Sequence, residues 1–250
     1  MGAAVAAALR GAGHDVLWAS DGRSGETRRR AEEAVLEDAG SAGELARRSD
    51  VVLSVCPPHA AVEVAQSVSG FGGVFVDANA VSPATAREVA GVVEAGGAEF
   101  VDGGIVGSPP RAPGTTRLYL SGETAATAAG LFAGTVVDAR IVSDEVGAAS
   151  AVKMAYAAWS KGTAAMLIAI RDLARAEGVE ATLAEEWRLS LPDVPARLER
   201  ALASAAAKGW RWVGEMEEIA SAFSAAGLPG GFHEAAAEMF RKLSAEPQRK

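Results

Sequence analysis

The sequence predicts an α/β protein in which a doubly wound parallel sheet is followed by a long joining helix and an all-helical C-terminal half. About 140 residues at the start alternate short β-branched runs with Ala-rich helical stretches, which is typical of a parallel sheet covered by helices on both faces. VVLSV and VFVDAN are nearly uninterrupted apolar runs, as expected for strands buried on both sides. After about Glu145 the strand-like runs stop, so the remaining chain is expected to be helical.

The first domain is predicted to span residues 1–144. Its strands are expected at residues 15–19, 51–55, 74–77, 99–102, 118–121 and 139–142. Its helices are expected at residues 25–33, 42–48, 60–67, 83–94 and 123–132, after a first helix that follows Gly2. Pro83 directly after Ser82 is typical of a helix start, with Ser82 as the N-cap.

The second domain, residues 145–250, is predicted to begin with a joining helix at 145–177. No proline interrupts residues 146–177, and Gly178 is placed to end the helix because glycine readily adopts positive φ. Further helices are expected at 181–189, 194–207, 214–226 and 233–243. Pro192, Gly209 and the LPGG at 228–231 mark the expected breaks between them.

The composition excludes several classes of function. Lys and Arg number 24 against 32 Asp and Glu, so the net charge is −8 and no broad basic face is available for nucleic acid or an anionic membrane. The longest uncharged apolar helical segment, residues 162–170, is too short to span a membrane. One cysteine excludes an internal disulfide, and three separated histidines with scattered acids argue against a metal site. These features favour a cytoplasmic protein without a metal.

The start of the chain resembles the second half of a dinucleotide-binding motif. Gly2 is followed by AAVAAALRGAGHDV, which predicts a helix, a turn and then a strand. The opening MG matches the end of a G-x-G-x-M-G loop, but no strand precedes it. We therefore expect Met1 to be an internal methionine of a longer natural protein. We also expect the 250-residue form to bind its cofactor weakly or not at all, because the first strand and two phosphate-loop glycines are absent from it.

Several motifs together identify a family. MG with AxxLxxxGHxV is followed in order by SVCPPHAAVEVA, VDANAVSP, FVDGGIVGSP and VGAASAVKMAYA. This series resembles the β-hydroxyacid dehydrogenases, which include 3-hydroxyisobutyrate, 6-phosphogluconate and tartronate semialdehyde enzymes, with imine reductases as relatives. GWRWVGEMEEIASAF and GLPGGFHEAAAEMF resemble a branch with a poorly characterised 6-phosphogluconate dehydrogenase-like C-terminal domain. The resemblance implies a Rossmann domain at 1–144, a nicotinamide cofactor, and a homodimer that uses residues 145–250 for substrate binding and dimerisation.

Lys153 is the candidate catalytic residue that the resemblance implies. An ammonium beside the nicotinamide can exchange the carbinol proton while hydride moves to or from carbon. Lys153 is surrounded by apolar residues, which would lower a lysine pKa by desolvation, although a solvated surface lysine is the alternative. The family pattern is incomplete, since Ala157 replaces an expected asparagine and Val106 an expected serine. The expected substrate-binding residues are Gly107, Ser108, Tyr156 and Trp212, although core packing is the favoured role for Tyr156.

The expected cofactor-binding residues lie at the start of the first helix and after successive strands. Gly2 opens the helix whose N-terminus would face the pyrophosphate. Ser20 and Arg23 favour the 2′-phosphate of NADP, although the nearby Asp21 would suit NAD, so NAD is possible. Cys56, Pro57 and Pro58 are expected to place backbone along the nicotinamide ribose. The Asn79 side chain is expected near the nicotinamide.

The sequence as a whole predicts an oxidoreductase that prefers NADP and interconverts a small, anionic hydroxy acid with its carbonyl form. One alternative is imine reduction, which the missing serine and asparagine favour and Lys153 opposes. The other is a cofactor-binding protein without turnover. The homodimer is expected to form through an apolar row on the joining helix, which consists of Val152, Ala155, Trp159, Met166 and Ile170.

Overall fold

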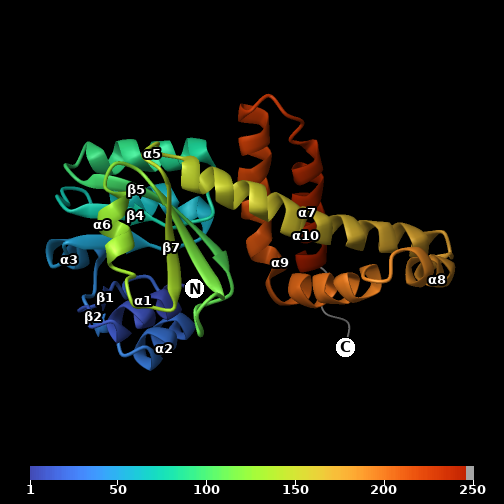
Figure 1. The fold of residues 1–250 in the computed structure, drawn as a ribbon, viewed down its shortest axis with the longest axis horizontal. Coiled ribbons are helices and arrows are strands. Elements are labelled where there is room, and N and C mark those ends of the chain that lie inside the picture. Colours follow the sequence, from blue (N-terminus) through green and yellow to red (C-terminus); the bar gives the residue numbers. More distant parts are fainter. Residues whose placement is uncertain (246–250) are drawn as a thin grey trace. The chain divides into compact units, whose positions relative to one another are not determined.

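The structure is a computed structural model that describes residues 1–245 (Figure 1). The chain divides into two compact units, Met1–Lys153 and Met154–Lys250. All seven strands among the described residues lie in the first unit, and the described part of the second unit is helical. The predicted α/β fold class with an all-helical C-terminal half is therefore confirmed.

The first unit alternates strands with helices along the chain. Its strands are β1 (Leu17–Trp18), β2 (Glu37–Asp38), β3 (Val51–Ser54), β4 (Val74–Asp77), β5 (Glu99–Gly107), β6 (Thr116–Ser121) and β7 (Val137–Ser143). Its helices are α1 (Gly2–Gly11), α2 (Gly25–Glu33), α3 (Ala42–Arg47), the short 3₁₀ helix Pro58–Ala60, α4 (Ala61–Gln66), α5 (Pro83–Glu94), α6 (Ala125–Gly130) and the beginning of α7 (Ala148–Ala176).

The strands form two sheets. β1 and β2 pair in parallel, and the second sheet has the order β3-β4-β5-β6-β7. Neighbours in the larger sheet are parallel except β5 and β6, which run antiparallel, whereas the sequence predicted parallel strands throughout. The physical reason is the connection: residues 108–115 are fewer than the dozen or so that a parallel crossover needs.

Side chains from both faces of the larger sheet are buried. On one face, Val52, Phe75 and Phe100 pack with residues of α4 and α5. On the other face, alternate residues of the same strands, including Val76 and Val101, pack with residues of α1 and α6. Because successive side chains of a strand point to opposite faces, this double burial explains the nearly uninterrupted apolar runs in the sequence.

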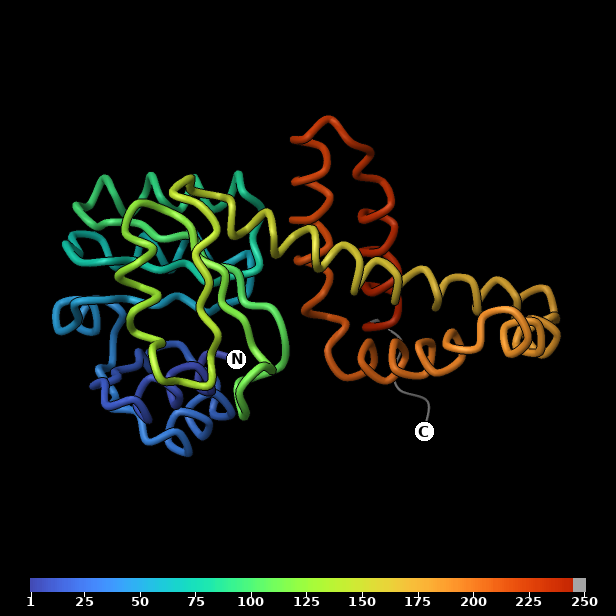
Figure 2. The backbone as a smooth tube through the Cα atoms, viewed as in Figure 1, coloured from blue at the N-terminus to red at the C-terminus, as the bar shows by residue number. Residues whose placement is uncertain are grey.

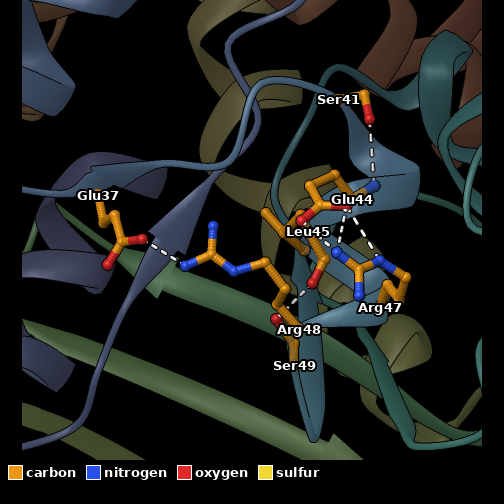
Figure 3. Close-up of polar contacts among 7 residues, drawn as sticks. All are labelled: Glu37, Ser41, Glu44, Leu45, Arg47, Arg48 and Ser49. Atoms are coloured by element: carbon orange, nitrogen blue, oxygen red, sulfur yellow. Dashed lines mark hydrogen bonds and ion pairs between the residues drawn. The ribbon is translucent and has the colours of Figure 1, made fainter.

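β2 was not predicted from the sequence, because two exposed acidic residues carry no strand pattern. Figure 3 shows the polar contacts of Glu37 in β2 and of the adjacent α3. Arg48, at the end of α3, donates a hydrogen bond to the Glu37 carboxylate. The Ser41 hydroxyl caps the start of α3 by accepting from the Glu44 N–H at 3.1 Å. The exposed ion pair between Arg48 and Glu37 adds little stability, so the pairing of β2 with β1 depends mainly on backbone contacts.

Two helix ends follow their sequence signals and a third departs from them. The Ser82 hydroxyl accepts from the Thr85 N–H, with Pro83 as the first residue of α5. Gly178 follows α7 with φ of +71°. Val35, after α2, is the one non-glycine residue among the described residues with positive φ, at +53°. A β-branched residue is strained in this conformation, and the sequence gives no sign of it.

The second unit contains most of α7 together with α8 (Glu180–Ser190), α9 (Val194–Ala225) and α10 (Gly231–Ala245). α9 runs through Gly209 without a break, so the two helices predicted at 194–207 and 214–226 are wrong. A single glycine costs a helix only about 1 kcal/mol. Here α10 packs against that position, since a Cβ on Gly209 would lie 3.9 Å from Phe240. Figure 2 shows α10 and the later part of α9 side by side.

The core of the second unit is apolar, and part of its surface is apolar too. Met154, Ile168, Met216, Ile219 and Phe240 are almost fully buried. Large exposed side chains on α7 are Tyr156, Trp159, Met166, Ile170 and Leu173. Except for Val152, which is half-buried, the row that the sequence analysis assigned to dimerisation is exposed.

Candidate functional site

Lys153 lies in the second turn of α7, against β5. Its Nζ donates a hydrogen bond to the backbone carbonyl of Ile105 at 2.9 Å, and its side chain is partly buried. The helix approaches β5 closely, because a Cβ added to Gly104 would lie 2.9 Å from the Lys153 Cβ. The ammonium therefore occupies a defined place beside the C-terminal part of β5.

A buried carboxylate on β5 holds the first turn of α7. One oxygen of Asp102 accepts from the N–H groups of Gly147 and Ser150 at 3.0 and 2.9 Å, and the other accepts from the Ser150 hydroxyl at 2.6 Å. Ser121 on β6 donates its hydroxyl to Asp102 and accepts from the Ala149 N–H, both at 3.0 Å. N–H groups at a helix start lack partners within the helix, and this network supplies them.

The residues after β3 and β4 form a second polar cluster. Asn79 is buried and donates its amide hydrogens to the Ser54 hydroxyl, at 2.9 Å, and to the Asp77 carboxylate. Its amide oxygen accepts from the Cys56 N–H. Asn79 thus fixes the turn that carries Cys56 and the following prolines. In the sequence, an Asn after a predicted strand indicates its place but not these partners.

The surroundings of the Cys56 thiol shift its pKa. Burial raises its pKa to about 11, and the Asp77 carboxylate also raises it. The positive charge of Arg23 acts on this pKa in the opposite direction. The raised pKa keeps this thiol protonated at neutral pH, which makes it unreactive as a nucleophile.

Ser20 and Arg23 occupy different environments, although only two residues separate them. Ser20 is buried, and its carbonyl accepts a hydrogen bond from Arg28 at 2.9 Å. Hydrogen bonds from the Gly40 N–H and the Ser20 hydroxyl lower the pKa of the Asp38 carboxyl, and the Arg28 charge lowers it further. Arg23 is exposed. Ser20 and Arg23 are both predicted to contact the cofactor, and of the two only Arg23 has an exposed side chain.

Gly2, Pro57 and Pro58 lie close to the end of β3. Gly2 begins α1, and a Cβ added to it would lie 3.5 Å from the Val55 side chain, which is ordinary contact. No side-chain cap is found at the start of α1 among the described residues. Pro57 precedes the short 3₁₀ helix that Pro58 opens. These positions bring the start of a helix next to the turn that Asn79 fixes.

Gly107, the last residue of β5, and Ser108 directly after it follow the carbonyl that Lys153 contacts. Gly107 has φ of +117°, and a Cβ there would lie 2.1 Å from the Thr115 carbonyl oxygen, so only glycine fits. Ser108 is exposed, and its carbonyl accepts from the Thr116 hydroxyl at 2.5 Å. Val106 is buried. Gly107 and Ser108 thus lie on the same strand end as the Lys153 contact.

Tyr156 and Trp212 belong to the second unit. The Tyr156 side chain is half exposed, so the core packing favoured in the sequence analysis is only partial. Trp212 packs edge-on against Phe240 with 5.0 Å between ring centroids, and Lys208 lies 5.8 Å from its ring. Trp212 therefore has a clear packing role in the helical unit.

Asp102 and Gly104 were not singled out from the sequence. The motif FVDGGIVGSP drew attention to Val106, Gly107 and Ser108, because those positions align with the substrate loop of the family. The signal that could have found the other two is the alternation along a strand, which places residues 102 and 104 on one face. That their partner is the start of α7 could not be read from the sequence.

No group of three or more His, Cys, Asp or Glu side chains that could hold a metal is present in residues 1–245. No helix in that range is long and apolar enough to cross a membrane.

Family models match both halves of the chain. Residues 1–131 match the NAD binding domain of 6-phosphogluconate dehydrogenase. Residues 174–243 match a domain of unknown function, DUF1932. The first match covers more than half of the chain.

A relative and several solved structures are similar to the chain. An uncharacterized 28.5 kDa protein in 7S RNA 5′ region of Methanothermus fervidus is 28% identical over 159 residues, or 63% of this chain. The alignment covers 61% of that relative, so the chain spans about three fifths of its length. A solved conserved protein of unknown function, described as structurally similar to 3-hydroxyacid dehydrogenases, is 26% identical with a TM-score of 0.69, over 97% of this chain and 92% of that one.

Two further solved structures share the fold at lower identity. A 3-hydroxyisobutyrate dehydrogenase from Salmonella typhimurium is 20% identical with a TM-score of 0.71, over 97% of this chain and 90% of that one. A reductive aminase from Aspergillus terreus, solved with NADPH and ethyl levulinate, is 22% identical with a TM-score of 0.61, over 98% and 90%. The fold is thus of the Rossmann type with a helical C-terminal part, as in nicotinamide-dependent oxidoreductases.

Proposed function

The chain belongs to the family of the NAD binding domain of 6-phosphogluconate dehydrogenase, and from that membership we propose that it is an oxidoreductase that prefers NADP. Its substrate is a small, anionic hydroxy acid, which it interconverts with the carbonyl form. Lys153 is the general acid and base. The observation that carries this proposal is the 2.9 Å hydrogen bond from Lys153 Nζ to the Ile105 carbonyl, which holds an amine at the end of β5.

The residues of the first unit fit a nicotinamide dinucleotide. Parallel α/β sheets bind such ligands at the carboxyl ends of their strands, and Arg23, Cys56 and Asn79 follow three of them. The uncapped start of α1 at Gly2 suits a pyrophosphate, because helix N-termini attract anions. Arg23 is exposed and cationic, which favours the 2′-phosphate of NADP over the free hydroxyl of NAD.

Lys153 moves the proton in this proposal. When bound, a nicotinamide cofactor accepts a hydride from the carbinol carbon or returns it to the carbonyl carbon. During oxidation, the neutral amine of Lys153 accepts the hydroxyl proton as the O–H bond breaks, and it becomes an ammonium. During reduction, the ammonium gives this proton to the carbonyl oxygen and returns to the neutral amine. The Ile105 carbonyl orients the amine, and the exposed Ser108 offers a hydroxyl to the anionic group of the substrate.

The second domain, residues 145–250, serves dimerisation and substrate binding in this proposal. Exposed apolar side chains on α7, among them Trp159, Met166 and Ile170, support the assignment, because apolar surface of this kind is typically covered by a partner. The partner is a second copy of the chain. Tyr156, half exposed on the same helix, is the proposed substrate contact there, with Trp212.

Imine reduction is the second candidate. It is favoured by Val106 and Ala157, which are buried apolar residues at positions where the hydroxy acid enzymes of the family carry a serine and an asparagine. The relationship to a reductive aminase by fold agrees with it. Lys153 favours the hydroxy acid, because an imine needs no base to remove a hydroxyl proton.

The test begins with cofactor binding by the purified full-length protein. Titration followed by NADPH and NADH fluorescence should show tighter binding of NADPH. Arg23→Gln should weaken NADPH binding by about tenfold and leave NADH within about twofold, because one ion pair with the 2′-phosphate is lost. Arg29→Gln is the matched control, since Arg29 is exposed on α2 and pairs with Glu33.

Turnover then separates the candidates. A panel of 2- and 3-hydroxy acids, semialdehydes and cyclic imines is assayed with the preferred cofactor. Oxidation of a hydroxy acid, lost in Lys153→Ala, supports the main proposal, and reduction of imines alone supports the second. Cofactor binding with no turnover on the whole panel contradicts both and favours a binding protein.

A further inference from the structure

We propose that Asp102 and Gly104 are positioning residues that set the place of the Lys153 ammonium, an inference that rests on the proposed function of Lys153. Both residues lie on β5, and neither is required to touch substrate or cofactor. Asp102 is fully buried, and Gly104 is buried beneath α7. Their effect on the reaction is exerted through the helix that carries the lysine.

The contacts between β5 and α7 are in register. Asp102 and Gly104 are two residues apart and share one face of the strand. On the helix, Ala149, Ser150 and Lys153 lie three and four residues apart and share one face. Asp102 accepts hydrogen bonds from Ser150. Gly104 faces Ala149 and Lys153, and a Cβ added to it would lie 2.8 Å from the Ala149 carbonyl oxygen.

Both ends of the Lys153 side chain are located by β5. Its Cβ faces Gly104, where a Cβ would come within 2.9 Å and something would have to shift. Its Nζ is held by the Ile105 carbonyl. A lysine stem has several rotatable bonds, so an amine fixed only at its tip would still move if its backbone shifted. Asp102 prevents that shift, because it binds the helix one turn before Lys153.

The way in which α7 is capped separates it from the three helices of the first unit that have a local side-chain cap. α2, α3 and α5 are capped locally, by the hydroxyls of Ser24, Ser41 and Ser82 at their own N-caps. α7 is capped by a carboxylate from a strand 45 to 48 positions earlier in the chain. A local cap stabilises a helix, whereas a cap from β5 also fixes the helix against the strand that holds the Lys153 amine.

The test measures how fast the Lys153 amine reacts, which requires no substrate. Wild-type protein and the variants Asp102→Asn and Gly104→Ala are treated with a trace amine-acylating reagent across a pH series, and mass spectrometry gives the rate at each lysine. Lys161, which lies on the same helix and is paired with Glu215, is the internal reference. The Lys153 rate relative to Lys161 should rise at least about threefold in both variants, because local opening of the first turn becomes more frequent.

One control variant and one kinetic measurement keep the result specific. Ser41→Ala removes the local cap of α3 and should leave the relative rate at Lys153 unchanged. Gly104→Ala should also lower kcat about tenfold while the cofactor KM stays within about twofold, because a small displacement of a catalytic group affects the reacting geometry and not cofactor binding. If Asp102→Asn does not fold, Gly104→Ala decides the question alone.

The outcomes distinguish this inference from the proposed function. Relative Lys153 rates equal to wild type in the folded variants would overturn the positioning role. Raised rates, together with full turnover in Lys153→Ala, would support the positioning of the amine by β5 and refute its role as the proton carrier.

Discussion

The α/β unit buries polar side chains, whereas the helical unit exposes apolar ones. Among the described residues, the buried polar side chains of the first unit are Ser20, Ser54, Asp77, Asn79, Ser82, Asp102, Thr116, Ser121 and Ser150, and the second unit has only His233. The large exposed apolar side chains of the second unit include Trp159, Met166, Leu173, Leu189, Trp210 and Phe232. Burying a polar group is costly unless it is hydrogen-bonded, so such groups are usually placed with precision.

The difference assigns separate tasks to the two units. Among these buried polar groups, Ser54, Asp77 and Asn79 fix the turns after β3 and β4, and Asp102 and Ser150 hold the beginning of α7. The exposed apolar side chains of the second unit do not fix a turn or a helix start, and apolar surface of this kind is typically covered by a partner. We therefore expect chemistry to depend on polar contacts in the first unit, and assembly to depend on apolar surface in the second.

The largest effect on stability is expected at Asn79. Asn79→Leu leaves the Cys56 N–H and the Ser54 hydroxyl without this partner, so the free energy of unfolding should fall by about 2 to 4 kcal/mol. Met216→Leu, a buried apolar exchange of similar volume in the helical unit, should cost less than about 1.5 kcal/mol. Urea unfolding measures both. Equal losses of unfolding free energy in Asn79→Leu and Met216→Leu would contradict the proposed difference between the two units.

A smaller effect, on assembly, is expected at Trp159. Trp159→Glu places a charge in the proposed interface, so the dimer should dissociate at least about tenfold more readily, while the unfolding of each chain hardly changes. Leu189→Glu, at an 82% exposed position on α8, is the matched control and should leave the dimer intact. Analytical ultracentrifugation over a concentration series measures the dissociation constant. A monomeric wild type at micromolar concentration would refute the interface.

The proposed site and the fold were predictable from the sequence to different degrees. Ser82 and Pro83 at the start of α5, and Gly178 after α7, follow local rules that depend on neighbouring residues alone. β2 was missed because its exposed acidic residues carry no strand pattern, and the unbroken α9 was missed because it depends on packing against α10. Asp102 was missed for the same reason, since its partners Gly147 and Ser150 are brought to it only by the fold.

His233, the buried polar residue of the helical unit, predicts a pH dependence. Burial lowers the pKa of its ring, which packs 4.4 Å from Phe223, and its Nδ1 has no hydrogen-bond partner among the described residues. The unfolded ring titrates near its ordinary pKa of about 6.5. As pH falls through that value the unfolded chain takes up a proton that the folded chain resists, so stability is lost until the folded ring also protonates.

His233→Phe should therefore lose less free energy of unfolding than wild type when the pH is lowered from about 7 to about 5. His59→Phe, at an exposed position, should behave as wild type. Denaturant unfolding at both pH values measures the difference. The same acid-induced loss in wild type and His233→Phe would show that this ring does not cause it.

The smallest effect is expected at the ends of two helices. Val35→Gly should raise the free energy of unfolding by about 0.5 to 1 kcal/mol, because glycine adopts the φ of +53° without strain. Val179→Gly, also after a helix but with φ of −113°, should lower it by a similar amount, because glycine there only adds freedom to the unfolded chain. Thermal unfolding measures both. A loss of stability in Val35→Gly would contradict the strain at this position.

Turnover by Lys153→Ala tests the central claim most directly. With the substrate found in the panel and saturating cofactor, kcat should fall by about two to four orders of magnitude, the usual contribution of a general acid or base. The cofactor dissociation constant should stay within about twofold, because the proposed cofactor contacts lie after β1, β3 and β4 and at the start of α1. A kcat equal to wild type in the folded variant would contradict the assignment of Lys153 as the proton carrier.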